Sequence, residues 1–465
     1  MSGKKPGRRL GAVIVAAALV VAACGDDDDG EDSTGAPSST ASAGATSATT
    51  APGAATSAGG GGGGSGGGAA ECTGTPEASD TGITAETYKI GVVASLTGSA
   101  APLFEPTVRA AQARVDLANA EGGICGRQIE LVEADDASNP QQNLSASQSL
   151  VQQQNVFMVV NPTAFVFGGY RFLQEQGVPV VGGCFDGPEW FQEPNTNMVC
   201  NIGNSHPDRP EYTTAAQFMK DQGATKVGSL GYGSSPSSSK AAENFHNHAA
   251  PAVGLEPVYL NTSLAFGTVD VGSVVLDLRN RGADGVNLPL INNSNFAVVT
   301  GGVQAGIDWK AAVMATGYGQ SLLDQPTAVS AAETPGVFMA SSFRPVEVPN
   351  EGTERMQAAF AEYADFEGVP DYAWYQGWLS MDLAIEGLLA AGVNPTRESY
   401  LDALHALGSW DGNGLLPRQV DISLEGFGQA QPETCAWYMK VENGEFVSAT
   451  GPEPVCGDLI EASIS

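Results

Sequence analysis

The chain has 465 residues, of which 52 are Asp or Glu and only 21 are Lys or Arg, so its formal net charge is −31. This balance argues against a nucleic-acid partner, because binding phosphate groups requires a basic face. Once a low-complexity N-terminal region is set aside, about 380–395 residues remain, which is too many for one ordinary hydrophobic core and predicts two lobes.

Residues 1–23 have the layout of a secretory signal. Four basic residues precede an apolar run of about 13 residues, Gly11 to Ala23, whereas a membrane-spanning helix needs about 20. The stretch Val21-Ala22-Ala23-Cys24 resembles the lipobox of bacterial lipoproteins, in which the signal is cleaved before the cysteine and the thiol is acylated. The resemblance implies an exported protein that is lipid-anchored through Cys24 on the outer face of the cytoplasmic membrane. An ordinary secretory signal with a chance cysteine is the alternative.

Residues 24–85 are predicted to form a disordered tether. Acidic residues dominate positions 26–32, and residues 33–70 are almost entirely Ser, Thr, Ala, Gly and Pro. The acidic part stays solvated beside an anionic membrane surface, and the remainder cannot bury enough apolar surface to offset chain entropy. With about 46 residues after Cys24, the tether has an r.m.s. reach on the order of 35–40 Å.

From residue 88 onward, strand patterns and helix patterns alternate. The apolar run at 88–98 is typical of a buried strand, and residues 107–123 have apolar side chains at helical spacing and end at Gly122-Gly123, a C-cap signal. Further strands are expected at residues 127–136, 157–161, 178–183, 226–232, 257–261 and 285–290. Further helices are expected at residues 143–156, 167–177, 211–223, 239–254 and 271–282. The alternation restarts after about Pro207, which predicts an α/β fold with a parallel sheet in each of two lobes.

Six cysteines follow Cys24, namely Cys72, Cys125, Cys184, Cys200, Cys435 and Cys456. An even number in an exported chain indicates disulfides, although six cysteines allow fifteen connectivities. Nearness along the chain and position in the expected fold favour Cys184–Cys200 and Cys435–Cys456, which leaves Cys72–Cys125. Metal binding is the alternative use of these thiols, but the sequence contains no CxxC pair, so neither a metal nor a cofactor is predicted.

The segment KIGVVASLTGSAAP, followed by LANAEGGICGRQIELVEADD, resembles the opening of the branched-chain amino-acid-binding family of type I periplasmic binding proteins. The likeness continues through QEQGVPVVGG, LDLRNRGADGV, TPGVFMASSF and YQGWLSMDLAIEGLLAAG, and so covers nearly all of the chain from Glu86 onward. It implies two Rossmann-like lobes joined by three crossovers, near His206–Arg209, Ser342–Pro345 and Arg418–Ile422. Lobe one would comprise residues 86–205 and 343–416, and lobe two residues 206–342 and 417–465.

The resemblance also implies a function. Members of this family capture a small organic solute between two closing lobes and deliver it to the permease and ATPase subunits of an ABC importer. We therefore expect a monomeric solute-binding lipoprotein, with a sensory lipoprotein on the same fold as the alternative. An enzyme is not expected. Ser237-x-x-Lys240 matches a serine β-lactamase motif, but it lies in a serine-rich run and is followed by neither Lys-Thr-Gly nor Ser-Asp-Asn.

Ligands of open α/β sheets bind beyond the carboxyl ends of the strands, where loops meet helix N-termini. The predicted ligand-binding residues in the loops of lobe one are Ser95, Thr97, Phe104, Thr163, Ala164, Phe165, Gly183, Cys184 and Asp186. Tyr372 and Trp374 join them from a later helix, and lobe two contributes Tyr232, Asn292 and Tyr318.

The sequence departs from its family at the ligand site. Amino-acid binders of this group place a serine and a threonine in the second and third loops of lobe one, where this chain has Ala164 or Phe165 and Asp186. They place an acid in the last loop of lobe two for the ligand ammonium, where this chain has Gly317 or Tyr318. Aromatic side chains gather in these loops, with Asn292 and Asn293 as neutral hydrogen-bonding groups. Aromatic walls favour flat or apolar ligands, so we expect an amide, an aromatic acid or a cationic compound rather than leucine, isoleucine or valine.

Overall fold

The computed structural model describes residues 72–185, 187–203, 206, 208 and 210–464. The predicted signal, Cys24 and Asp186 lie outside these residues. The described residues lie within one compact unit, which contains two main β-sheets. No helix in the described part of the chain combines the length and apolarity needed to cross a bilayer.

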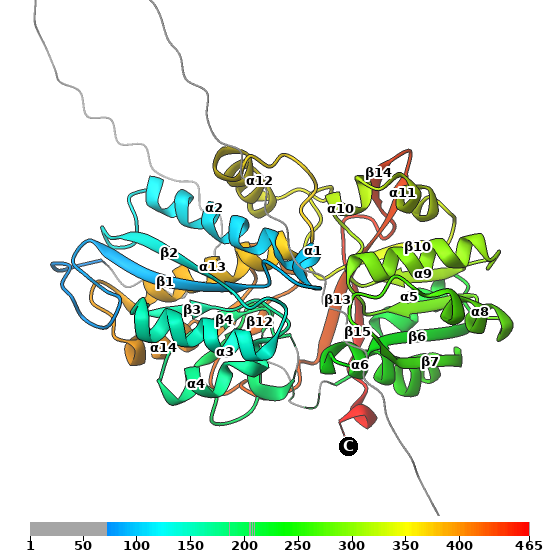
Figure 1. Ribbon diagram of the computed structural model, residues 1–465, viewed down its shortest axis with the longest axis horizontal. Coiled ribbons are helices and arrows are strands. Elements are labelled where there is room, and N and C mark those ends of the chain that lie inside the picture. Colours follow the sequence, from blue (N-terminus) through cyan, green and yellow to red (C-terminus); the bar gives the residue numbers. More distant parts are fainter. Residues whose placement is uncertain (1–71, 186, 204–205, 207, 209, 465) are drawn as a thin grey trace, which may run out of the picture. The chain divides into compact units, whose positions relative to one another are not determined.

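The first sheet is parallel throughout, in the order β2-β1-β3-β4-β5. Its strands are β1 (Thr87–Ala94), β2 (Gln128–Asp135), β3 (Met158–Val160), β4 (Val180–Gly182) and β5 (Met198–Cys200). Successive side chains of a strand point to opposite faces, so Ile90 and Val92 pack on one face and Val93 on the other. Helices cover both faces, with α2 (Pro106–Ala120) and α13 (Tyr372–Ala391) on one and α3 (Pro140–Gln148) and α4 (Tyr170–Glu175) on the other (Figure 1).

The second sheet has the order β14-β13-β10-β9-β8-β6-β7, and β15 pairs with β13. The central strands are parallel, and β13 joins β10 antiparallel. The strands are β6 (Lys226–Tyr232), β7 (Glu256–Leu264), β8 (Gly285–Leu288), β9 (Ala311–Met314), β10 (Val337–Ser341), β13 (Glu433–Glu442), β14 (Glu445–Ser448) and β15 (Val455–Asp458).

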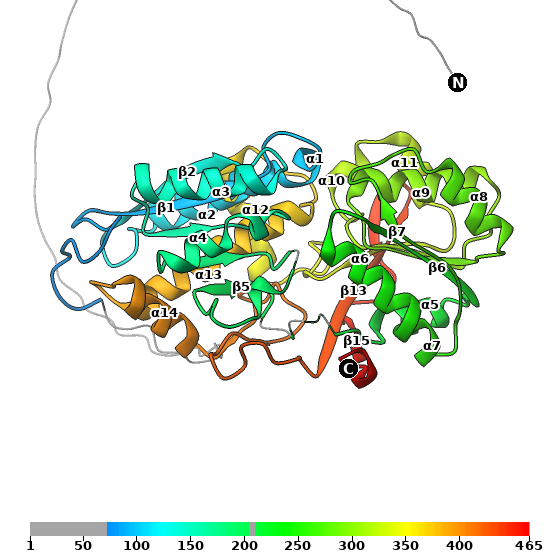
Figure 2. The same cartoon turned by 60° about the horizontal axis from the view of Figure 1, so that its bottom comes forward.

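Helices also cover both faces of the second sheet (Figure 2). One face carries α5 (Thr214–Asp221), α6 (Pro236–Asn244), a π-helical turn (Phe245–Ala249) and α7 (Ala250–Ala252). The other carries α8 (Gly272–Asn280), α9 (Asn292–Gln304), α10 (Gln320–Leu323) and α11 (Pro326–Ala332). The remaining elements are α1 (Ala101–Phe104), α12 (Glu351–Ala364), α14 (Arg397–Ala406), β11 (Ser409–Trp410), β12 (Val420–Asp421), a π-helical turn (Ser149–Gln153) and 3₁₀ turns at Val166–Gly168, Pro188–Trp190 and Glu461–Ser463.

The chain passes from one sheet to the other between β5 and α5, between β10 and α12, and between β12 and β13. Because helix α13 packs against α2, the segment after the second passage belongs to lobe one. One lobe therefore has a parallel sheet and the other a mostly parallel sheet, and three passages of the chain join them, so the prediction of two α/β lobes joined by three crossovers is confirmed.

The three disulfides favoured by the sequence are present, Cys72–Cys125, Cys184–Cys200 and Cys435–Cys456. The last of these joins directly opposed residues of β13 and β15.

The segment 72–85 differs from the prediction of a disordered tether. Besides the Cys72–Cys125 bond, the fully buried Arg127 holds this segment against lobe one. Its guanidinium donates to the carbonyl oxygens of Thr84 at 2.6 Å and Glu77 at 2.7 Å, and also to that of Val393. The predicted boundary at residue 85 is therefore too far along the chain.

Candidate ligand-binding cleft

A cavity of about 280 Å³ lies between the lobes, at the carboxyl ends of strands from both sheets. Lobe one lines it with Leu103, Phe104, Ala164, Gly183, Cys184, Phe185, Ile202 and Tyr372. Lobe two and the second passage line it with Tyr232, Ser235, Ser237, Ser238, Ala241, Phe266, Pro289, Leu290, Ile291, Ala315, Thr316 and Ser342. A larger groove on lobe two is bordered by the sides of α8, α9 and α11 rather than by strand ends. Since strand ends are where open α/β sheets bind ligands, the interlobe cavity is the candidate site.

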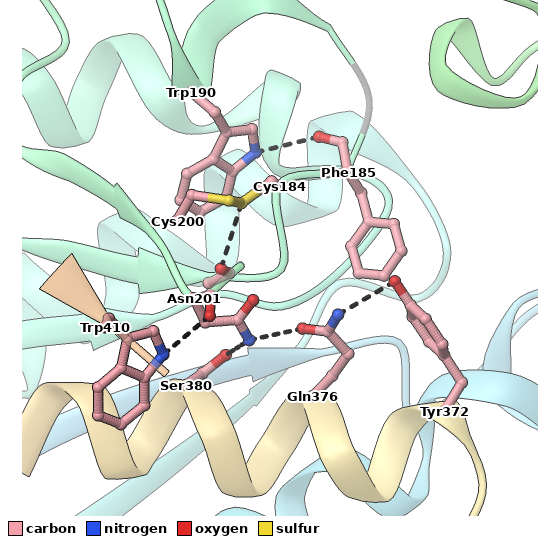
Figure 3. Close-up of a disulfide and its surroundings, with 10 residues drawn as sticks. Cys184, Phe185, Trp190, Cys200, Asn201, Tyr372, Gln376, Ser380 and Trp410 are labelled. Atoms are coloured by element: carbon pink, nitrogen blue, oxygen red, sulfur yellow. Dashed lines mark hydrogen bonds between the residues drawn. A yellow bond between two sulfur atoms is a disulfide. The ribbon is translucent and has the colours of Figure 1, made fainter. Parts of the chain in front are cut away.

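Aromatic rings from both lobes face this cavity. In lobe one, the ring of Phe185 contacts Phe104 edge-on with centroids 5.2 Å apart, and Tyr372 with centroids 5.7 Å apart. Figure 3 shows the rings of Phe185 and Tyr372 next to one another. In lobe two, the ring centroids of Tyr232 and Phe266 lie 4.7 Å apart. The cavity therefore offers apolar, polarizable walls suited to a flat or hydrocarbon group.

A buried hydrogen-bond network fixes the lobe-one wall (Figure 3). The side-chain amide of Asn201 donates to Gln376 at 2.7 Å and to Ser380 at 2.9 Å, and Gln376 in turn donates to the hydroxyl of Tyr372 at 3.1 Å. Trp190 donates to the carbonyl oxygen of Phe185 at 3.0 Å. Because the Cys184–Cys200 disulfide ties the same loop to β5, both rings of the wall are held from behind.

The lobe-two wall is built around the start of α6. The side chain of Ser235 caps this helix by accepting the backbone N–H of Ser238. The hydroxyl of Ser238 donates to the carbonyl oxygen of Pro289 at 2.6 Å and accepts the N–H of Tyr232. In the Ser237-x-x-Lys240 motif, Ser237 lines the cavity whereas Lys240 is exposed on α6.

Six of the predicted ligand-binding residues line the cavity, namely Phe104, Ala164, Gly183, Cys184, Tyr232 and Tyr372. Asp186 lies outside the described residues. The others are placed elsewhere, and each has an identifiable structural partner.

Three hydroxyl groups predicted to contact the ligand bond to acids of lobe one in this structure. Ser95 and Thr163 each donate to the fully buried Asp136 at 2.7 Å. Thr97 donates to Asp135 at 2.6 Å. These contacts satisfy a buried carboxylate and hold the strand ends together.

Side chains predicted to form the aromatic part of the site are divided between the cavity and the core. Trp374 stacks on Phe366 with centroids 4.1 Å apart, away from the cavity. Tyr318 donates to Glu347 at 2.6 Å, and burial raises the pKa of Tyr318. Phe165 packs across the lobes on Phe266.

Asn292 is buried and donates to Ser321 at 2.7 Å rather than lining the cavity.

Sequence reasoning missed several lining residues. Phe266 lies two residues after the end of β7, a strand end that the prediction did not use. It is the clearest omission, because an aromatic residue shortly after a strand was a readable signal. Leu103 and Ile202 carried no such signal, since isolated aliphatic residues in loops are common.

Comparison with known proteins identifies periplasmic binding proteins as relatives of this chain. A family model described as "Periplasmic binding protein" matches residues 87–445. The Leu/Ile/Val-binding protein homolog 8 of Brucella abortus is 30% identical over 249 residues, which is 52% of this chain and 60% of that relative. The chain thus spans less than two thirds of the length of this curated relative.

Solved structures of similar fold carry names that refer to different kinds of solute. A fatty acid ABC transporter substrate-binding protein from Thermomonospora curvata matches with a TM-score of 0.66 and 19% identity, over 84% of this chain and 96% of its own. A branched-chain amino acid transporter substrate-binding protein from Streptococcus pneumoniae, in complex with isoleucine, matches with a TM-score of 0.62 and 20% identity, over 80% of this chain and 100% of its own. At these identities the likeness establishes the fold and leaves the ligand open.

Proposed function

This chain belongs to the periplasmic binding protein family, and we propose that it captures a small organic solute outside the cytoplasm and delivers it to an ABC importer. The observation that carries the proposal is the cavity between the lobes, which is lined by strand-end loops from both sheets. A solute held by both walls binds the closed arrangement better than the open one, and so favours closure by that difference in affinity. Similar folds are described as substrate-binding proteins of ABC transporters for a fatty acid and for a branched-chain amino acid.

The proposal includes an anchor and a mode of action. Cys24, acylated after removal of residues 1–23, would hold the protein on the outer face of the cytoplasmic membrane, and the following segment would tether the binding unit as a monomer. The ligand would be bound and released without chemical conversion. The ligand contacts would come from the aromatic residues Phe104, Phe185, Tyr232, Phe266 and Tyr372.

Calorimetry against a panel of amino acids, amides, monocarboxylates and amines, combined with small-angle X-ray scattering, tests this function. We expect at least one solute to bind with micromolar or tighter affinity, to be recovered unchanged, and to decrease the radius of gyration. A protein that binds no solute of the panel, or whose bound form scatters like an open free form, would contradict capture by lobe closure. Import lost on deletion of the gene would separate transport from a sensory role.

A further inference from the structure

A second cavity, of about 250 Å³, adjoins the aromatic one on the side where the chain passes between the lobes. Cys184, Ile202, Ser237 and Ala241 line both cavities, so the two meet at the disulfide Cys184–Cys200 and at one side of α6. Each volume is slightly below the about 300–1,000 Å³ of typical small-molecule pockets. A ligand that extends through both would therefore be longer than one that fills either cavity alone.

The second cavity contains the guanidinium of Arg418, which forms no ion pair with an acid among the described residues. Arg418 is half-buried there, and its Nη1 donates to the carbonyl oxygen of Gln419 at 3.0 Å and the side-chain oxygen of Gln431 at 3.5 Å. Burial lowers the pKa of Arg418, and electrostatic interactions with Tyr212 and Glu433 partly oppose this decrease. In a chain with 52 acidic and 21 basic residues, a cation left unpaired in a cavity is available to an anion from outside.

The acid in the same cavity is a hydrogen-bond donor rather than a competing anion. Burial raises the pKa of Glu211 to about 8, and a hydrogen bond from the backbone N–H of Tyr212 only partly opposes this shift. At pH 7 the protonated form of the Glu211 carboxyl is therefore favoured. The groups facing it are the phenols of Tyr212 and Tyr438, whose pKa values burial also raises, so both are neutral. Among its described lining residues, the cavity thus presents one cation, Arg418, and neutral hydrogen-bond donors.

The first cavity has the opposite character. Its described lining residues are apolar, aromatic or hydroxyl-bearing, and none of them is charged. An ammonium group placed among them would lose its hydration without gaining an ion pair, which is strongly unfavourable. A hydrocarbon chain or a phenyl ring carries no charge, so it would not incur this desolvation cost.

We propose that the two cavities form one binding site for an elongated apolar monocarboxylate, an acyl or aryl-alkyl acid, whose carboxylate lies beside Arg418 and whose apolar part lies among the rings of the first cavity. This inference rests on the proposed solute-binding function and names its substrate class. A guanidinium matches a carboxylate with parallel N–H donors, and such charge-assisted bonds are about twice as strong as neutral ones. Protonated Glu211 supplies a further donor to the same carboxylate.

Calorimetry at pH 7 with octanoate and phenylbutanoate, each beside its primary amide, tests the inference. We expect the acids to bind at least tenfold more tightly than the amides. Arg418→Gln should weaken the binding of the acids about 10- to 100-fold, the loss expected for a charge-assisted hydrogen bond, and leave that of the amides within threefold. Arg279→Gln, which removes the same charge from the exposed last turn of α8, is the control and should change neither.

The acid Glu211 provides a second, independent readout. In the wild-type protein, acid binding should weaken between pH 7 and pH 9 as Glu211 ionises. Glu211→Gln keeps a neutral donor and should bind the acids at pH 9 as tightly as at pH 7. Leucine and octylamine complete the panel and should bind more weakly than octanoate.

The outcomes distinguish the inference from the proposed function. Equal binding of acid and amide, failure of both acids to bind, an equal loss for both in Arg418→Gln, or tighter binding of octylamine or leucine would each overturn the carboxylate assignment. Capture of some other solute would then still support the proposed function. That function fails only if no solute of the wider panel binds.

Discussion

Asp371 joins the two lobes beside the cleft, and its protonation should make stability depend on pH. Its carboxylate precedes α13 of lobe one and accepts the hydroxyl of Ser321 at 3.1 Å and the N–H of Ser321 at 3.3 Å, from α10 of lobe two. Burial raises the pKa of Asp371 from its usual 3.8 to about 7, assisted by nearby Asp324 and opposed by the bonds from Ser321. A carboxyl group whose pKa is raised in this way ionises more easily in the unfolded chain than in the folded protein.

The magnitude follows from the shift. The stabilisation is complete below about pH 4, where both states are protonated, and is lost as the pH rises towards 7, because only the unfolded state then gains charge. A rise of the Asp371 pKa from 3.8 to about 7 corresponds to roughly 4 kcal/mol in full, of which roughly 2–3 kcal/mol falls between pH 5 and pH 8. Asp371→Asn retains an oxygen that accepts from Ser321 and cannot ionise. Between pH 5 and pH 8, the free energy of unfolding of this variant should therefore rise by roughly 2–3 kcal/mol relative to that of the wild type.

Urea denaturation of both proteins at the two pH values, followed by tryptophan fluorescence and circular dichroism, measures this difference. Burial also raises the pKa values of Glu211, Glu347 and Glu386, but these groups are present in both proteins and cancel in the comparison. Asp277→Asn, an exposed change on α8, should track the wild type. If Asp371→Asn loses the same stability as the wild type from pH 5 to pH 8, the ionisation of Asp371 is not coupled to folding and the reasoning is refuted.

Two further predictions concern the attachment of the binding unit. Arg127→Met should lower the free energy of unfolding by about 3–5 kcal/mol, because it removes a buried cation from several carbonyl partners. The control Lys89→Met, at the partly exposed Lys89–Glu130 pair, should lower it by less than about 1 kcal/mol. Equal losses for the two variants in urea denaturation would contradict the role of Arg127 in holding residues 72–85. Cys24→Ser should move the protein from the membrane fraction to the soluble fraction without altering its circular dichroism, and a variant that stays on the membrane after carbonate washing would exclude the lipid anchor.

The fold was predictable because its signals are local and repeated. Several strands of lobe one are short apolar runs, such as Phe157 to Val160, and β1, β2 and β3 are each followed by a helix before the next strand. A run of this kind needs cover on both faces, which a parallel sheet with flanking helices supplies. Two of the disulfides, Cys184–Cys200 and Cys435–Cys456, followed from proximity along the chain and position in the expected fold, and Cys72–Cys125 was the pair that remained.

The candidate site was only partly predictable, because strand ends present many polar groups and few of them reach the cavity. Ser95 and Thr163 have the residue type and position of ligand contacts, yet they bond to Asp136, whose burial depends on how two strand ends and α3 pack together. The attachment of residues 72–85 was hidden for a related reason. Arg127 holds this segment through backbone carbonyl groups, which every sequence possesses, so no side-chain pattern marks the contact.

The two adjoining cavities of the cleft differ in their lining, and under the carboxylate proposal this difference gives them separate roles. The lobe-one wall is fixed by a disulfide and by the buried network from Asn201 to Tyr372, so its aromatic surface is formed before a ligand arrives. Preformed apolar walls favour binding by shape and burial, and discriminate weakly among solutes of similar size. Strong discrimination requires a group that a wrong ligand would leave unpaired, and Arg418 in the adjoining cavity is such a group. The aromatic cavity would therefore set the affinity for an apolar body, and the cavity of Arg418 would decide which head group is accepted.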